Sequence, residues 1–472
     1  MSRRKKSSQG WLAFQGSNLA VTREYFGKYD RISQILDDTP EILELVHGDL
    51  KEELRSLREA RGCERKKACQ YSSDTVLRVV VCQQVENLSL RQAVIRIDDS
   101  HFLRNFTRIF GGPMMDFSVL CRLRNAIQPT TWRKINAALS SYAVEEELVT
   151  GEKLRMDTTA VETNIHWPSD SALLWDTYRV LARLIETARD LRPRSAGKGR
   201  IRLKDAKRHY TKIARAVRGG KNKDKLRTLY KPLVEDVERL LEWSENVAER
   251  LKGLAGSQRT SSLIAAEATW IASEIRHYHK LGQQVVQQTV ARVYDENKVP
   301  ADQKIFSIFE EHTEMLVRGK AARNIEYGHM VNFEQVDGKF ITHYQVFEKK
   351  PNEHLLLPAA LERHKKLFGQ YPDQAAADKG YWPGKEGLPE IEEKVRVVSI
   401  GKMGKRSAEE DEREWDPEFR DGQMFRAGIE GTIAFLKRVL GLARCFRKGW
   451  AHFVANVGAT VLAHNLLILA RC

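Results

Sequence analysis

The run of helical patterns between residues 171 and 318 is the feature that most restricts the fold of this chain. Apolar residues recur at spacings of three and four in SALLWDTYRVLARLIETARDL (171–191), in YKPLVEDVERLLEWSENVAERLKGL (230–254) and through 261–294, with no good strand candidate among them. In the segment just before, LRMDTTAVETN (154–164), a short apolar lead that ends at Asp157 reads as the first strand. The sequence therefore predicts a mixed α/β sheet that is interrupted after its first strand by a long all-α insertion.

Strand patterns return after residue 324. NIEYGHMVNFEQV and KFITHYQVFEK are separated by Asp-Gly, which supplies the positive φ of a tight turn, so they predict a β-hairpin. A helix (EHLLLPAALERHKKLFG), a strand (QAAAD), a helix (LPEIEEK), a strand (VRVVSI) and further helices follow. We expect residues 151–170 and 319–472 to form one sheet-containing domain, with 171–318 as a helical insertion domain.

The N-terminal part is helical throughout 72–150, with Ser, Asp or Thr at the expected helix starts. Residues 1–150 are therefore predicted to form an all-α domain that serves DNA binding, dimerisation or both. Basic residues lie on the polar faces of these helices. Arg91 could approach DNA, but a compact bundle with a solvated face explains the same pattern.

Charge points to the class of partner. The 472-residue chain carries a net charge of +15, which favours a polyanion, because Lys and Arg that neutralise phosphates release condensed counterions. The excess is densest in 192–231, where Lys and Arg far outnumber acids. A solvated helical face or a mobile loop explains such a run as well as phosphate contact does. The candidate DNA contacts in this segment are Lys204, Lys207, Arg208 and Lys212.

Three features indicate a cytoplasmic protein without a membrane partner. The N-terminal MSRRKKSSQG lacks the apolar stretch of a secretory signal. The six cysteines include no CxxC pair, and Cys63 and Cys69 have no histidines nearby, so reduced thiols are expected rather than metal ligands. FVANVGATVLAHNLLILA (453–470) is interrupted by two asparagines and His464, so it is expected to be a buried helix rather than a membrane span.

Three acids are candidates for a shared site. Asp157 and Asp378 each come at a strand end, where a carboxylate faces a cleft, although an Asp in that place also commonly caps a turn. MFRAGIEGTIAFLKR places Arg426, Glu430 and Lys437 along one helix face. An Arg–Glu surface pair followed by an unrelated lysine is the plain alternative. The glycines that flank the glutamate would allow backbone or ligand to approach closely.

These residues resemble the DDE transposases of bacterial insertion sequences. In that family an RNase H-like sheet carries an Asp on its first strand, an Asp on a later strand in a DxGY-like context and a Glu on a following helix, matched here by Asp157, Asp378 and Glu430. The helix is similar to the family's Y-x2-R-x3-E-x6-K signature, with Gln423 at the tyrosine position. RGKAARNIEYGHMV and the helical segments between 71 and 127 also resemble family segments. The resemblance implies an RNase H-like fold and a DNA transposase.

The resemblance also implies metal-dependent phosphodiester chemistry. Three carboxylates suit two Mg²⁺ ions about 3.5–4 Å apart, for which Mn²⁺ can substitute. Asp157 would bridge both ions, while Asp378 and Glu430 would each take one. Water would nick the transposon end, and the freed 3′-hydroxyl would attack target DNA. Arg426 and Lys437 would neutralise phosphate near the scissile bond.

The implied partner is double-stranded DNA, as terminal inverted repeats and as target, bound by a homodimer or a higher oligomer. Thr158 and Thr159 are expected to support the turn or to contact phosphate, because the sequence places no base beside them. Two alternatives stay open: a nuclease with the same site that cuts without joining, and a catalytically silent DNA-binding protein derived from a transposase. The presence of all three acids argues against the silent protein.

Overall fold

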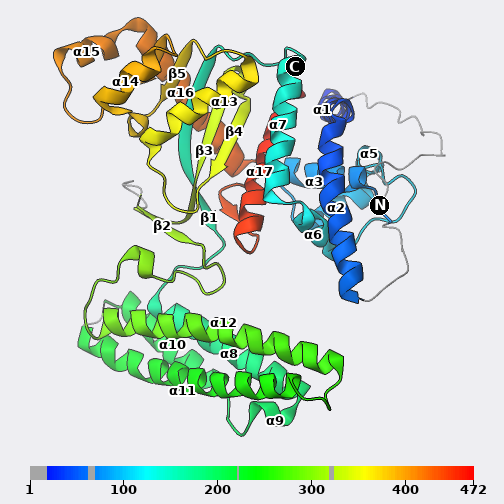
Figure 1. Cartoon of the computed structure of the whole chain (residues 1–472), viewed down its shortest axis with the longest axis vertical. Coiled ribbons are helices and arrows are strands. Elements are labelled where there is room, and N and C mark those ends of the chain that lie inside the picture. The colour runs from blue at the N-terminus through cyan, green and yellow to red at the C-terminus, as the bar shows by residue number, and fades with distance from the viewer. Residues whose placement is uncertain (1–18, 62–69, 221–222, 318–323, 472) are drawn as a thin grey trace. The chain divides into compact units, whose positions relative to one another are not determined.

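The computed structural model describes residues 19–61, 70–220, 223–317 and 324–471. The N-terminal MSRRKKSSQG, the RGK of 318–320, Cys63, Cys69 and Cys472 lie outside the described residues. Two compact units make up the chain (Figure 1). Unit 1 comprises Met1–Thr163 and Gly328–Cys472, and unit 2 comprises Asn164–Tyr327.

The helices of unit 1 form an N-terminal group and a group around the sheet. The N-terminal group is α1 (Ala20–Asp38), α2 (Pro40–Arg61), α3 (Ser73–Val85), α4 (Leu90–Asp99), α5 (His101–Phe106), α6 (Phe117–Ala126) and α7 (Pro129–Glu145). The second group is α13 (Leu356–Phe368), α14 (Gly384–Glu392), α15 (Ala408–Trp415), α16 (Pro417–Arg438) and α17 (Trp450–Leu469), with the 3-10 turns η2 (Asp337–Lys339), η3 (Glu353–Leu355) and η4 (Lys379–Tyr381).

The helix starts follow the side-chain chemistry of the N-terminal segment. Ser72, Ser89 and Asp116 each accept a backbone N–H at the start of α3, α4 and α6, as the Ser and Asp signals predicted. For α7 the predicted Thr start is wrong, since the helix begins at Pro129. Proline suits this first position because its fixed φ is already helical and the missing N–H would have no partner there.

The sheet is mixed, as predicted. Its strands are β1 (Lys153–Thr163), β2 (Glu314–Val317), β3 (Ile325–Val336), β4 (Ile341–Val346), β5 (Gln374–Ala377), β6 (Val397–Ile400) and β7 (Arg444–Cys445). The order is β2-β3-β1-β5-β6, with β4 paired to β3 and β7 paired to β1. β1 runs antiparallel to β3 and parallel to β5, and β5 runs parallel to β6. The predicted hairpin is β3–β4, with Gly338 at φ +67 in the turn.

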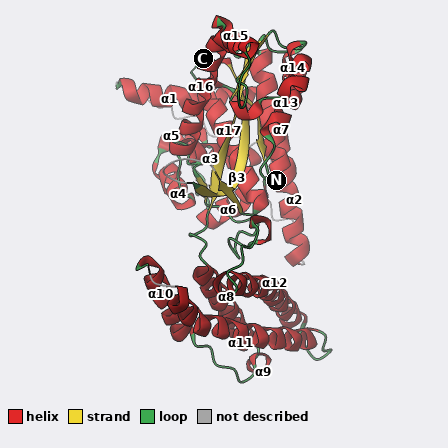
Figure 2. Cartoon of the chain, turned by 90° about the vertical axis from the view of Figure 1, so that its left-hand side faces the viewer, coloured by secondary structure: helices red, strands yellow, loops and turns green. Residues whose placement is uncertain are grey.

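Helices cover both faces of the sheet, as the yellow strands between red helices in Figure 2 show. Leu154 of β1 packs with apolar side chains of α13, on one face. The next residue, Arg155, points to the other face, where its guanidinium lies 4.4 Å from the ring of Phe425 in α16. Because successive strand residues alternate between faces, Asp157 lies on the α16 face and Thr158 on the α13 face.

The N-terminal helices and the sheet share one hydrophobic core. Trp132 of α7, Phe333 of β3 and Phe453 of α17 belong to the same buried cluster. Among the described residues, α17 is the one helix long and apolar enough to cross a membrane, and 78% of its most apolar stretch is buried inside the protein. The prediction of a buried helix at 453–470 is confirmed.

Unit 2 is a helical bundle. Its helices are α8 (Asp170–Leu191), α9 (Pro193–Ala196), α10 (Leu203–Arg218), α11 (Lys223–Ala255) and α12 (Ser262–Val293), with the 3-10 turn η1 (Ala301–Gln303). α8, α11 and α12 bury their apolar faces in a core of their own, which confirms the predicted helices. Two details differ: α11 begins seven residues before Tyr230 with Pro232 inside it, and β2 lies where no strand was predicted.

Candidate active site

Strand pairing brings Asp157 and Asp378 together. β1 and β5 are parallel neighbours in which Arg155 lies opposite Ala376. Asp157 is two residues further along β1, and Asp378 is two residues further along the β5 chain, so the same register places the two acids opposite each other. Asp378 directly follows β5, as predicted, but the prediction that Asp157 comes at a strand end is wrong, because β1 continues to Thr163 through its pairing with β3.

The electrostatics agree with this proximity. Burial, followed by the charge of Asp378, raises the pKa of Asp157 to about 6, and the guanidinium of Arg426 acts in the opposite direction. Two close carboxylates repel each other when both are ionised, which favours either a proton or a bound cation between them. This pair is therefore suited to hold a cation at neutral pH.

Asp378 also caps the turn that follows it. It is the N-cap residue of η4, and its Oδ1 accepts a hydrogen bond of 2.8 Å from the backbone N–H of Gly380. This is the capping role that the sequence left open as an alternative. An ionised carboxylate has about four acceptor sites, so the cap leaves capacity for a cation. The cap fixes the orientation of the carboxylate beside Asp157.

Arg426 of α16 links the aspartate pair to the third predicted acid. Its Nη2 lies 3.3 Å from Glu430, whose side chain is 65% exposed. The expected Arg–Glu surface pair is thus present. The buried Nε of Arg426, however, has no hydrogen-bond partner among the described residues. An unmatched buried donor costs free energy, while the rest of the side chain is 21% exposed and can meet a phosphate.

Gln423, at the position where the family signature has tyrosine, anchors α16 to the sheet. Its side-chain nitrogen donates to the carbonyl of Ala377 at 3.2 Å and to the carbonyl of Ser399. These carbonyls lie at the ends of β5 and β6. Gln423 therefore holds the helix that carries Arg426 and Glu430 against the strand that delivers Asp378. Lys437 lies in the last turn of the same helix.

The two glycines beside Glu430 have different surroundings. A Cβ on Gly428 would clash with Nη1 of Arg155, so this glycine lets α16 approach β1 closely. Nothing lies within 4 Å of a Cβ on Gly431. Close approach is thus explained at one glycine only.

Glu353 is a site residue that the sequence analysis missed. It lies in η3, just before α13, and its carboxylate accepts a hydrogen bond from Oγ1 of Thr158. Its charge also contributes to raising the pKa of Asp157. The sequence shows it only as an acid at the start of a predicted helix, which is a common and uninformative place for one. No local signal connects it with β1.

The chemistry of the donors fits Mg²⁺, which prefers carboxylate oxygens. Asp157 and Asp378 supply two carboxylates in register. Within the described ranges, no group of three or more His, Cys, Asp or Glu side chains is already gathered around one cation position. Glu430 is one helical turn from Arg426 and exposed, so it reaches the pair only if its side chain leaves the 3.3 Å contact with the arginine.

The predicted phosphate contacts of unit 2 share one helix. We call Lys204, Lys207, Arg208 and Lys212 the α10 basic face; all four are exposed. Arg208 also lies 3.0 Å from Asp205. The opposite side of α10 buries Ala206, Ile213 and Ala216. The segment is therefore an amphipathic helix with a basic outer face, and the loop alternative is wrong for these four residues.

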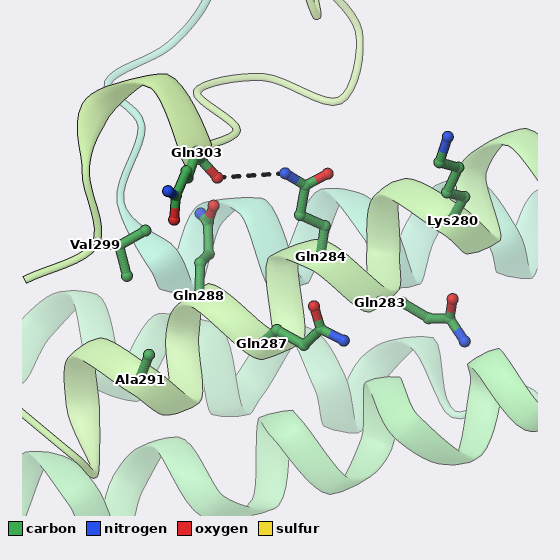
Figure 3. Close-up of a pocket in the computed structure, with 8 residues that line it drawn as sticks. All are labelled: Lys280, Gln283, Gln284, Gln287, Gln288, Ala291, Val299 and Gln303. Carbon is green, nitrogen blue, oxygen red and sulfur yellow. Dashed lines mark hydrogen bonds between the residues drawn. The ribbon is translucent and has the colours of Figure 1, made fainter. Parts of the chain in front are cut away.

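A separate groove of about 500 Å³ belongs to unit 2. Figure 3 shows it between α12 and the segment around Gln303, with glutamine side chains along one face of the helix. Gln284 donates to the carbonyl of Gln303 at 3.3 Å, and Gln288 bonds both the N–H and the carbonyl of Ile305. The lining residues include no carboxylate, imidazole or thiol, and Lys280 is the one charged side chain among them.

Strand register brings the two aspartates together, and burial and charges of both signs act on Asp157. Arg426 and Gln423 join this pair from α16, and Glu353 joins it from η3. The α10 basic face belongs to the other unit. Comparisons with models of protein families, with curated proteins and with solved structures found no match to this chain.

Proposed function

We propose that this protein is a DNA transposase of the DDE type that cleaves insertion-sequence ends and joins them to target DNA. The observation that carries the proposal is the register of two adjacent parallel strands, which places Asp157, within β1, opposite Asp378, just after β5. Paired carboxylates in this position are what metal-dependent phosphodiester chemistry requires. The raised pKa of Asp157 supports it, because strongly perturbed groups gather at functional sites.

The fold supports an RNase H-like catalytic unit. The first strand of the sheet carries one aspartate, a later strand beside it delivers the second, and a following helix carries Glu430. The segment between the first strand and the hairpin is the helical unit 2, in keeping with a catalytic sheet that is interrupted by an insertion.

Each residue of the site has a distinct role in the proposal. Asp157 and Asp378 would hold Mg²⁺, and Glu430 would complete the set after it turns from Arg426. When bound, Mg²⁺ supplies Lewis-acid stabilisation of charge at the attacking and leaving oxygens. The partly exposed guanidinium of Arg426 would contact a phosphate oxygen of the scissile strand. Gln423 keeps α16 and the Asp378 turn in a fixed relation.

The net charge of +15 and the α10 basic face support DNA as the partner. Neutralised phosphates release counterions, so these side chains contribute binding free energy without reading sequence. The active form in this proposal is at least a homodimer on DNA, because one chain carries one such site and paired-end joining uses two.

Strand-transfer assays on DNA that carries the matched ends test the proposal against its alternatives. A transposase releases 3′-hydroxyl ends and then links them covalently to target DNA in Mg²⁺. A nuclease with this site gives the ends but no joined product. A silent DNA-binding protein shifts the mobility of end DNA and gives neither product, and that result would refute the proposal.

A further inference from the structure

Glu353 contacts both chain segments that carry the paired aspartates. On one side its carboxylate accepts the hydroxyl of Thr158, the residue that follows Asp157 in β1. On the other side it lies against Gly380, where a Cβ would clash with the Glu353 carboxylate and lie 3.0 Å from Oδ1 of Asp378. One side chain from a third segment thus contacts β1 beside Asp157 and the turn that follows Asp378.

We propose that Glu353 is a positioning residue of the active site, which holds the Asp157 and Asp378 segments at the separation that cation binding requires. The inference rests on the proposed function and adds to it a residue that belongs to none of the predicted acids. Gly380 is part of the same device, because only a residue without a side chain lets the Glu353 carboxylate come this close to the Asp378 turn.

A buried polar layer supports Glu353 on the α13 face of the sheet. Tyr381 is fully buried, and its hydroxyl donates to Oδ1 of Asn332 at 2.7 Å. Asn332 lies opposite Thr158 in the β1–β3 pairing. The Thr158 hydroxyl that contacts Glu353 therefore lies on a strand whose neighbour, β3, is tied to the Asp378 turn through Tyr381, so this contact can transmit position to β1.

The charge of Glu353 favours a positioning role at a cation site over a role in packing alone. Among the described residues Glu353 forms no ion pair, although two other carboxylates lie near it. Arg426 is a cation beside Asp157, but a single guanidinium leaves a net negative charge among three acids, and the third acid costs free energy that a neutral hydrogen-bond acceptor would avoid. A bound divalent cation offsets this repulsion. The arrangement therefore fits a cation site better than a packing contact.

The test uses the full-length protein and two variants, each of which changes one partner of the Glu353–Thr158 hydrogen bond. Glu353→Gln keeps an oxygen that accepts the Thr158 hydroxyl and removes the charge, and Thr158→Val removes the hydroxyl at nearly constant volume. The matched control is Glu348→Gln, because Glu348 is an exposed glutamate in the same connection between β4 and α13. Binding of Mn²⁺ alone, followed by electron paramagnetic resonance, is measured beside the cleavage rate as a function of Mg²⁺ concentration.

We expect Glu353→Gln to weaken Mn²⁺ binding and to lower the cleavage rate at limiting Mg²⁺, each by about 10–100-fold, as is typical when the support of a metal ligand is lost. Excess Mg²⁺ should restore part of the rate. Thr158→Val should act in the same direction. The double variant should lose less Mn²⁺ affinity and less cleavage rate than the product of the two separate fold-changes. DNA binding of Glu353→Gln should match that of the control, and in metal-free buffer its unfolding midpoint should be no lower than that of the control.

Unchanged Mn²⁺ binding by a folded Glu353→Gln protein would overturn the inference. So would equal losses for Glu353→Gln and Glu348→Gln. If the wild-type protein binds Mn²⁺ but cleaves no DNA, the proposed function fails, while the Mn²⁺ comparison still decides the role of Glu353. If Thr158→Val unfolds the chain, Glu353→Gln alone decides it.

Discussion

Replacing Asp157 by asparagine is expected to stabilise the folded protein in metal-free buffer while it removes the proposed activity. Burial and the charge of Asp378 raise the pKa of Asp157 from its ordinary value of 3.8 to about 6. Because the folded-state pKa is the higher one, the protonated form favours folding. Its contribution is fully present below pH 3.8 and is lost as the pH rises through 6.

The magnitude follows from this shift. One pKa unit corresponds to about 1.4 kcal/mol, so above pH 6 the ionised carboxylate costs the folded state at most about 3 kcal/mol. Asparagine has nearly the same shape and carries no charge. The gain in unfolding free energy of Asp157→Asn over wild type should therefore be small below pH 4, rise between pH 4 and 6, and level off near or below that value.

Urea unfolding in EDTA at a series of pH values from 4 to 8 measures this gain. Asp99→Asn, at an exposed aspartate of α4, is the control and should stay within about 0.5 kcal/mol of wild type at every pH. Added Mg²⁺ should stabilise wild type more than Asp157→Asn, because a ligand stabilises the state that binds it. A gain that does not change with pH, or a loss of stability at pH 8, would refute the reasoning.

Three further predictions concern the α10 basic face, the contacts of Gln423 and the number of chains in the active complex. Neutralising the α10 basic face should weaken DNA binding and reduce its salt dependence by a slope of about 0.9 per lost phosphate contact; an unchanged slope would leave this face merely solvated. Gln423→Met removes both bonds to the strand ends at similar volume, so it should cost about 1–3 kcal/mol of unfolding free energy and slow cleavage; wild-type stability and rate would exclude the anchoring role. Mass photometry with cleaved end DNA should find at least two chains in the active complex, and paired-end joining by a complex with one chain would contradict this.

Local patterns predicted the parts of the fold that local chemistry decides. The Asp-Gly turn of the β3–β4 hairpin needs a positive φ, and Gly338 has one. The three long helices of unit 2 carry apolar stripes that are visible in the sequence. β7 was missed because a strand of two residues carries no readable alternation. β2 is as long as β5 and β6, which were predicted, but it falls in the segment that was read as helical up to residue 318.

The site could be predicted in part for the same reason. Asp157 and Asp378 follow strand patterns, so their meeting could be expected from the sheet alone. Glu353 and Gln423 act through contacts between segments that are far apart in the chain. Glu353 meets a threonine 195 positions away, and Gln423 meets the carbonyls of two strands. Spacing along the sequence carries no information about such contacts.

The most direct test of the account is cleavage of the element's own ends by wild type and by alanine variants of the three predicted acids, with and without Mg²⁺. The account predicts nicking by wild type that requires Mg²⁺ or Mn²⁺, and no detectable nicking by Asp157→Ala, Asp378→Ala or Glu430→Ala, while all four proteins bind end DNA alike. Near wild-type cleavage by Asp157→Ala or Asp378→Ala in Mg²⁺ would contradict the central claim that the β1–β5 aspartate pair is the catalytic centre.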